Sequence, residues 1–335
     1  MPTIASPNEA DLTLFRRELD GFVPDRIFDA HAHLWARGHV PPGSSPAFES
    51  APQEVMGLVE YRRLMAAMLG GREVAGGLFI PGAVAAQGAD LTAENELVAR
   101  EVARDGRCRS ALLVSPEMDG DFVRAEVRRL RPAALKCYHL RSAARPTWDA
   151  VLPQYLPEAH VRVADEEGLC IVLHLVRPRA LADPSNQHWI RRYCERFPRM
   201  NLILAHAGRG FNPYHTIEGI WPLRDLPNLW CDMSAVTEVG ACEAIIEALG
   251  HERLLYGSDF PVSHLRGRCV AVGDGFVWLY EETLAWETVS FQPLHPTLVG
   301  LESLRVLKQA AWRCRLSDRQ VEDIFYNNAM HLFEG

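Results

Sequence analysis

His31 and His33 are the residues of this chain whose types and spacing point most directly to chemistry. They belong to the run DAHAH at residues 29–33, which follows the apolar residues Ile27 and Phe28. If this segment is a β-strand, side chains two residues apart point to the same face, so both imidazoles can bind one metal ion. Two hydrogen-bonded core histidines or two surface histidines would give the same pair. Taken alone, the pair leaves metal binding open.

Further residues that suit a metal centre lie at the ends of other apolar runs. Lys136 lies in AALKCY (133–138), His174 ends CIVLH (170–174), His206 ends LILAH (202–206) and Asp259 ends LLYGSD (254–259). Singly, each has an ordinary role, because a lysine can extend to solvent and an aspartate can form a turn. Together with the first pair they give six polar groups at five strand ends. Imidazole and carboxylate are ligands of zinc, manganese and iron, so the set predicts a metal centre.

Short apolar runs that alternate with helical patterns must position these residues. Helical spacing is found over 93–104, with Thr92 as a candidate cap, and over 121–130, 153–167, 185–197 and 241–249. The alternation predicts βαβ units and a parallel sheet. Eight strand-then-helix repeats predict an α/β fold, a closed (β/α)8 TIM barrel whose catalytic groups lie at the C-terminal strand ends. A doubly wound sheet is the alternative, but no glycine-rich phosphate loop follows the first run. The candidate strands are 26–34, 74–80, 110–115, 133–139, 170–176, 202–207, 229–234 and 254–258.

Two irregular regions interrupt what we predict to be one domain over residues 1–335, with an N-terminal extension at 1–24. Residues 34–52 are rich in proline, glycine and serine, and predict a long loop after the first strand, on the catalytic face. Residues 262–300 predict an insertion after the last strand that caps the pocket or forms a subunit contact. Its aromatic stretch is more typical of packing than of ligand binding. A final helix is predicted to begin after Ser317. The aromatic residues of the insertion are Trp278, Tyr280, Trp286 and Phe291.

The composition limits the classes of function. The chain has 335 residues and a net charge of −8, which argues against nucleic-acid binding and against attraction to anionic membranes. No apolar run is long enough to span a bilayer, and no secretory signal is recognisable. Eight cysteines without a C-x-x-C pair predict buried free thiols in the cytoplasm. We therefore expect a cytoplasmic protein that acts on a small molecule, as a homodimer or an oligomer with related subunits.

The motifs resemble those of the amidohydrolase superfamily. The resemblance is carried by residues 29–33, by Leu173-His174, by LAHAG at 204–208 and by YGSDFP at 256–261. The last motif and the closing helix at 324–333 are similar to the amidohydrolase-2 branch. That branch includes lactone hydrolases and decarboxylases similar to aminocarboxymuconate semialdehyde decarboxylase.

The resemblance implies roles for the six polar groups. His31, His33, His174 and Asp259 would bind a divalent metal, and His206 would bind a second ion or act as base and electrophile beside a single one. Lys136 would be carboxylated and bridge two ions in a binuclear centre, which we expect over a single-ion site. Zinc is the first expectation for the metal, with manganese or iron as alternatives.

Hydrolysis of an amide, ester or lactone is the expected reaction, with Asp259 passing a proton from the attacking water to the leaving group. Non-oxidative decarboxylation on one metal is the alternative, and Arg209 or His139 would then face the substrate carboxylate. An iron- or manganese-dependent oxygenase and a non-catalytic subunit of the same fold remain open. The candidate substrate-binding residues are His139, Arg209, His215, His264 and Trp35.

Overall fold

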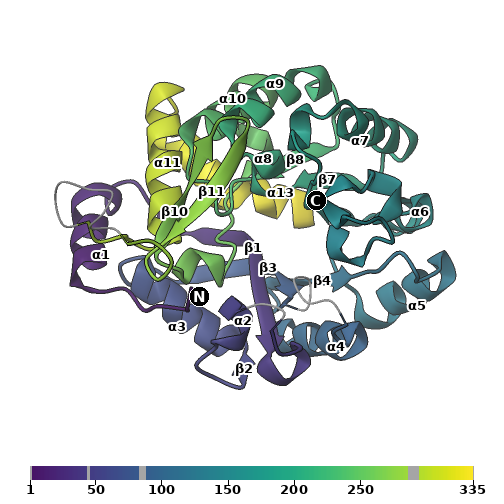
Figure 1. The fold of residues 1–335 in the computed structure, drawn as a ribbon, viewed down its shortest axis with the longest axis horizontal. Coiled ribbons are helices and arrows are strands. Elements are labelled where there is room, and N and C mark those ends of the chain that lie inside the picture. The colour runs from purple at the N-terminus through teal and green to yellow at the C-terminus, as the bar shows by residue number, and fades with distance from the viewer. Residues whose placement is uncertain (1, 44–45, 83–87, 286–293, 335) are drawn as a thin grey trace.

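Eight parallel strands, hydrogen-bonded in chain order, form the centre of the molecule (Figure 1). The computed structural model describes residues 2–43, 46–82, 88–285 and 294–334. A short strand, β2 (Val55–Met56), pairs antiparallel with the end of the first strand. The parallel strands are β1 (Ile27–Ala36), β3 (Val74–Pro81), β4 (Cys108–Leu113), β5 (Ala134–Cys137), β6 (Cys170–Leu173), β7 (Asn201–Leu204), β8 (Leu229–Asp232) and β9 (Leu254–Leu255).

Backbone hydrogen bonds between β1 and the segment after β9 close the sheet on itself. The Ala30 N–H donates to the Tyr256 carbonyl at 2.9 Å, and the His33 N–H donates to the Phe260 carbonyl at 2.8 Å. The Asp259 N–H donates in turn to the His31 carbonyl at 2.7 Å. The predicted α/β TIM barrel is confirmed. The closing seam also joins the two sequence motifs that were expected to form a metal centre.

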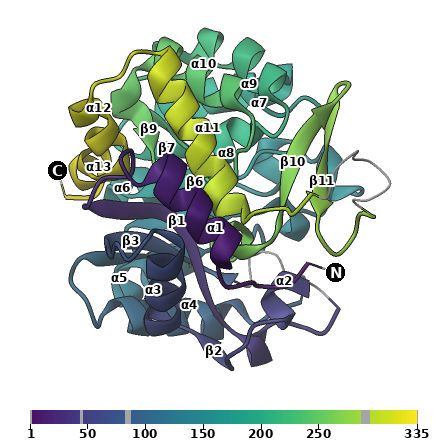
Figure 2. The ribbon, with the colours of Figure 1, turned by 90° about the vertical axis from the view of Figure 1, so that its left-hand side faces the viewer.

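Helices surround the strands (Figures 1 and 2), and several begin at side-chain caps. Asp119 and Asp183 accept hydrogen bonds from backbone N–H groups in the first turns of α5 (Gly120–Leu130) and α7 (Pro184–Arg196). The prediction of Thr92 as a cap was wrong, because α4 begins at Leu91 and Asp90 caps it. None of the helices in the described residues is both long and apolar enough to cross a membrane. The principal helices are α3 (Leu58–Met68), α4 (Leu91–Val102), α5 (Gly120–Leu130), α6 (Glu158–Glu167), α7 (Pro184–Arg196), α9 (Pro213–Gly219), α10 (Val239–Leu249) and α11 (Val299–Arg313).

The C-terminal segment packs against one cluster of strand side chains. Alternate residues of β6 fall into two clusters: Ile171 packs in the large one, and Val172 in a smaller one that also holds Ala329 of α13 (Asn328–Glu334). Phe333 stacks on Phe28 with ring centroids 5.6 Å apart. Ser317 caps α12 (Asp318–Glu322), as predicted.

The insertion after β9 forms an antiparallel hairpin, β10 (Gly267–Val272) and β11 (Gly275–Tyr280). Trp286 and Phe291, which the sequence placed in the same aromatic stretch, lie outside the described residues. The loop after β1 includes the short helix α2 (Pro46–Glu49), and the Trp35 indole N–H donates to the Phe48 carbonyl at 3.0 Å.

A buried ion pair ties the base of the hairpin to the N-terminal segment. Arg266 contacts both carboxylate oxygens of Asp11, at 2.6 and 3.2 Å, and the Thr297 hydroxyl donates to the same carboxylate at 2.6 Å. Burial raises the pKa of Asp11, but these hydrogen bonds outweigh burial, so the pKa lies below its ordinary value. The pair therefore stabilises the fold above about pH 4, and this contribution is lost as the pH falls through the folded pKa.

Replacing Arg266 with methionine is expected to lower the free energy of unfolding by about 3–5 kcal/mol, because it leaves the Asp11 carboxylate buried without its partner. Chemical denaturation at neutral pH measures this. Arg305→Met is the control, since Arg305 is half-exposed and its ion pairs are worth about 1 kcal/mol or less. Equal losses in the two variants would contradict the role given to the buried pair.

Candidate metal centre and active-site cavity

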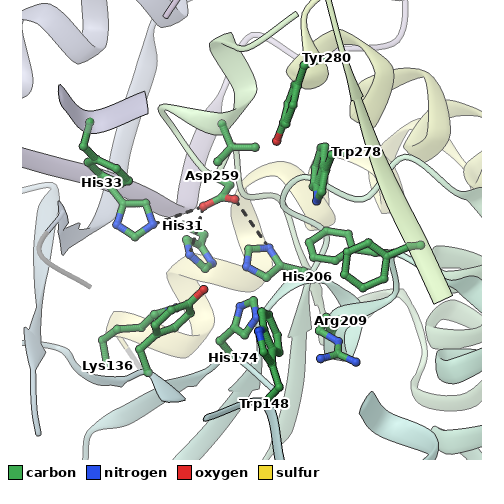
Figure 3. A pocket seen from close by; sticks show the side chains of 15 residues that line it. His31, His33, Lys136, Trp148, His174, His206, Arg209, Asp259, Trp278 and Tyr280 are labelled. Atoms are coloured by element: carbon green, nitrogen blue, oxygen red, sulfur yellow. Dashed lines mark ion pairs between the residues drawn. The ribbon is translucent and has the colours of Figure 1, made fainter. Parts of the chain in front are cut away.

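A cavity of about 330 Å³ lies at the C-terminal ends of the barrel strands (Figure 3). All six residues predicted as metal ligands line it: His31, His33, Lys136, His174, His206 and Asp259. The remaining lining residues are Phe48, Tyr138, Trp148, Arg209, Phe211, Val262, Phe276, Trp278 and Tyr280. A volume and a mixed lining of this kind are typical of small-molecule sites.

His31, His33 and Asp259 meet at the closing seam of the barrel. Oδ1 of Asp259 lies 3.3 Å from Nε2 of His33 and 3.6 Å from Nε2 of His31. Asp259 has a positive φ of 53°, an uncommon conformation for a non-glycine residue that is often found at functional sites. Gly257 allows the close approach, because a Cβ there would lie 2.9 Å from the Cβ of His31.

Asp29, the first residue of the DAHAH run, joins the two sides of this seam through hydrogen bonds. Its carboxylate accepts hydrogen bonds from the backbone N–H groups of His31 and Ser258, at 3.1 and 2.9 Å, and from the Tyr61 hydroxyl at 2.6 Å. All of these groups are buried. The contacts fix the end of β1 relative to the Asp259 loop.

Asp232, at the end of β8, determines which nitrogen of His31 carries the proton. Its Oδ2 lies 2.9 Å from Nδ1 of His31, and a carboxylate there accepts the Nδ1–H. Nε2 of the neutral imidazole then carries a lone pair and no proton. This lone pair faces the oxygen of Asp259, so two hydrogen-bond acceptors point at each other inside the protein.

His206 and His174 present similar nitrogens on the neighbouring strands. His206 Nδ1 lies 2.9 Å from the Ser234 carbonyl, which assigns the proton to Nδ1 and leaves Nε2 as an acceptor. Within the described residues, the buried Nε2 atoms of His31 and His174 have no hydrogen-bond partner. His206 and Ala207 both have φ near 55°, and this left-handed turn after β7 carries His206 at its start.

The electrostatics keep the imidazoles neutral and the carboxylate charged. Burial lowers the pKa of His31, His33 and His206 below the ordinary value. Burial raises the pKa of Asp259, but positive charge on His206, His31 and His33 and the hydrogen bond from His33 outweigh burial and hold the pKa near about 2. When the imidazoles are neutral, a cation bound beside Asp259 would lower its pKa in the same way. Neutral imidazole and ionised carboxylate are the forms in which these side chains bind metals.

A divalent cation fits this arrangement of donors. His31, His33 and Asp259 form a group whose ligand atoms lie within 4.8 Å of one another, and all three line the cavity. A second group combines His31, His206 and Asp232, but Asp232 is fully buried and does not line the cavity. Asp232 is therefore better placed to orient His31 than to bind an ion, as acids beside ligating histidines commonly do.

Lys136, on β5, is buried at the wall of the cavity. Its side chain is 2% exposed, and within the described residues it forms no ion pair with a carboxylate. Burial lowers the pKa of the Lys136 amine. A neutral amine in this position can combine with carbon dioxide or act simply as a neighbour of the metal ligands.

Arg209 alone of the five predicted substrate-binding residues lines the cavity. Its guanidinium donates to the carbonyls of Arg177 and Pro178, at 2.5 and 3.1 Å. Its Nε is buried without a partner, and no carboxylate pairs with it in the described part of the chain. The cavity therefore contains a guanidinium that forms no ion pair with a carboxylate among the described residues.

The other four predicted residues lie outside the lining. His139 contacts Trp148 and the Thr147 hydroxyl, and His215 contacts Asp274 at the hairpin turn. His264 is fully buried beside Phe260 and Ser263, and Trp35 is packed against Phe48. Trp35 lies near the end of β1 and His215 in α9, and the local backbone turns all four side chains away from the cavity, which no sequence pattern showed.

The sequence interpretation missed Asp232 and most of the aromatic walls. The run LWCDMS at 229–234 ends in a polar residue like the others, so Asp232 could have been found by the same reasoning. Phe276, Trp278 and Tyr280 alternate with period two, which is the signature of one face of a strand. Tyr138, Trp148 and Phe211 come from loops and gave no such signal.

Replacing Asp232 with asparagine is expected to weaken metal binding about 10–100-fold, because the amide no longer holds the Nδ1–H tautomer of His31. Competition with a metal chelator, followed by elemental analysis, measures the change. Asp225→Asn is the matched control, since Asp225 is an exposed partner of Arg191. Unchanged affinity in the Asp232 variant would show that the carboxylate does not orient His31.

Comparisons with known proteins agree with this geometry. The family model described as amidohydrolase matches residues 28–335. An L-fucono-1,5-lactonase from Burkholderia ambifaria is 30% identical over 118 residues, a match that spans 30% of this chain and only 39% of the lactonase.

Solved structures share the fold at low sequence identity. An amidohydrolase from Burkholderia multivorans, solved with HEPES, superposes with a TM-score of 0.59 at 15% identity, covering 92% of this chain and 99% of that one. The same Burkholderia protein has also been solved with bound zinc. A 5-carboxyvanillate decarboxylase from Novosphingobium aromaticivorans, with bound manganese, gives a TM-score of 0.55 at 13% identity, covering 95% and 98% of the two chains.

Proposed function

This chain belongs to the amidohydrolase family, and we propose that it is a metal-dependent hydrolase acting on an amide, ester or lactone bond of a small molecule. The observation that chiefly supports the proposal is the buried Nε2 of His31, a nitrogen without a proton that lies 3.6 Å from the Asp259 carboxylate. The buried Nε2 of His174, which also has no hydrogen-bond partner in the described residues, lines the same cavity. Two buried acceptors that face each other are unfavourable unless a cation or a proton lies between them.

We propose that His31, His33, His174 and Asp259 hold the first divalent ion, and that His206 and Lys136 complete a site for a second. Zinc is our first expectation, with manganese or iron as alternatives. A divalent ion in this position supplies a water of lowered pKa and polarises a carbonyl oxygen. The protein's own groups then have to move protons and position the substrate.

Asp259 is the group best placed to move protons. Its low pKa keeps the carboxylate charged at neutral pH, so it can accept the proton of the attacking water and deliver it to the leaving oxygen or nitrogen. Burial raises the pKa of Tyr138 to about 12, so its hydroxyl stays protonated and can donate to a substrate oxygen. The aromatic walls exclude bulk water and strengthen these interactions.

Decarboxylation is a second candidate function, with which Arg209 is compatible. A buried guanidinium without a carboxylate partner is suited to a substrate that carries its own carboxylate. A hydrolase of an acidic lactone would use the same contact, so Arg209 does not decide between the two reactions.

Product analysis in isotopically labelled water distinguishes the reactions. Zinc-loaded protein is incubated with a panel of lactones, aryl esters, amides and aromatic acids in water enriched in oxygen-18. Hydrolysis predicts one labelled oxygen in the new carboxylate and no release of carbon dioxide. Carbon dioxide release from an acid, without hydrolysis of any panel member, would overturn the hydrolase assignment in favour of the decarboxylase.

A further inference from the structure

The β10–β11 hairpin presents an aromatic face to the cavity. Phe276, Trp278 and Tyr280 alternate along β11 and all line the cavity, whereas Val277 between them is 42% exposed. Trp278 and Tyr280 are stacked, with ring centroids 5.4 Å apart and planes 6° apart. Figure 3 shows both rings beside Asp259.

This face continues to the metal centre through Phe211. The Phe211 ring lies 5.3 Å from Trp278 and 5.1 Å from Phe276, and it stacks on the His206 imidazole at 5.4 Å. Trp148 lies on the same cavity, and the Arg209 guanidinium is 5.6 Å from its ring and 5.8 Å from that of Phe276. A flat ring placed near His206 would therefore have aromatic neighbours and a cation within reach.

Polar contacts at the hairpin turn hold this face in place. Asp274 pairs with His215 Nε2 and with Arg179 Nε, each at 3.3 Å. The Asn212 side-chain amide donates to the carbonyls of Gly273 and Gly275, at 3.1 and 3.0 Å. These partners come from the loops after β6 and β7, so the hairpin is fixed at its tip as well as at its Arg266 base.

The cavity is poor in groups that recognise hydroxyls. Among its described lining residues there is no serine, threonine, asparagine, glutamine or glutamate, and the one carboxylate, Asp259, belongs to the metal centre. A polyhydroxylated sugar lactone would lose water from several hydroxyls and could regain hydrogen bonds mainly from the Tyr138 and Tyr280 hydroxyls and the Arg209 guanidinium, so much of that loss would stay uncompensated. A flat ring would instead bury apolar surface against aromatic rings.

We propose that the hairpin determines specificity, with Trp278 and Phe276 stacking on a planar ring of the substrate while Arg209 binds an acid group on that ring. The substrate class is then a planar cyclic carboxylate rather than a sugar lactone. This inference rests on the proposed function for the reaction, but it concerns only the ring and the acid group that the cavity selects.

Calorimetric titration of the zinc-loaded full chain tests the proposal with ligands that do not react. The probes are benzoate, cyclohexanecarboxylate, which has the same acid group on a puckered ring, and D-glucono-1,5-lactone. Benzoate should bind most tightly. Trp278→Ala should weaken benzoate about tenfold, in line with the strength of aromatic stacking, and remove its advantage over cyclohexanecarboxylate. Arg209→Gln should weaken both acids alike, by about tenfold or more.

Two further variants show that the effect belongs to the inner face. Val277→Ala, on the outer face of the same strand, should leave benzoate binding unchanged, and Trp278→Phe should keep most of it. Equal binding of the two acids, undetectable benzoate binding, tighter binding of the lactone, or an unaffected Trp278→Ala variant would each overturn the proposal. If planar acids are preferred but the labelled-water experiment finds no hydrolysis, the proposed reaction fails while this inference stands.

Discussion

Asp259→Asn is expected to lower kcat/KM by about 10²–10⁴-fold while most of the bound metal remains. The amide keeps an oxygen that can face the ion but cannot accept the proton of the attacking water. Asparagine has nearly the same shape as aspartate, so the substitution removes the negative charge with little change in packing. The charge is removed at an oxygen, Oδ1, that lies within 3.6 Å of Nε2 of both His31 and His33. Steady-state kinetics on the best panel substrate and elemental analysis of the same sample measure the two effects.

The control for this variant is Asp225→Asn, which removes an exposed carboxylate that does not line the cavity. It should keep full activity. Full activity in the Asp259 variant would show that its carboxylate does not transfer the proton of the attacking water. Loss of metal together with activity would assign Asp259 to metal binding alone and leave the proton carrier to another residue.

Lys136→Ala is expected to lower the metal content from two ions per chain to one and to reduce turnover sharply. The Lys136 amine is buried on the cavity wall and has no carboxylate partner in the described residues. A carboxylated Lys136 that bridges two ions would explain why a lysine is buried there. Lys308 is the matched control, because it is the other lysine of the chain and lies on the exposed side of α11. Removal of carbon dioxide during metal loading should mimic the Lys136 variant, and added bicarbonate should restore the wild type but not the variant. An unchanged stoichiometry would instead show that Lys136 only neighbours the ligands.

The barrel could be predicted from the sequence because its strands are short apolar runs separated by helical patterns. The candidate ligands followed from the fold, since residues that end parallel strands must meet at one end of a barrel. His174 and His206 illustrate this: they are 32 residues apart in the chain, yet their rings lie 5.1 Å apart. The strand pattern was therefore sufficient to predict that the six residues lie close together.

The rest depended on loop conformation, which a single sequence does not reveal. Trp35 and His264 belong to segments expected on the catalytic face, but both turn into the core. The hairpin was expected only as an insertion, because the glycines at 273 and 275 favour irregular structure, although Phe276, Trp278 and Tyr280 alternate with the period of a strand. The role of Asp232 appears only when its distance to His31 is known.

Elemental analysis of the purified protein determines whether His31 and His33 hold a metal ion. We predict at least one divalent ion per chain that survives dialysis, with zinc as the first expectation, and its loss in a His31→Ala, His33→Ala double variant that stays folded by circular dichroism. A wild-type chain that binds no zinc, manganese or iron under any loading condition would show that the cavity holds no metal centre. A double variant that retains the full metal content would show that the two histidines are not its ligands.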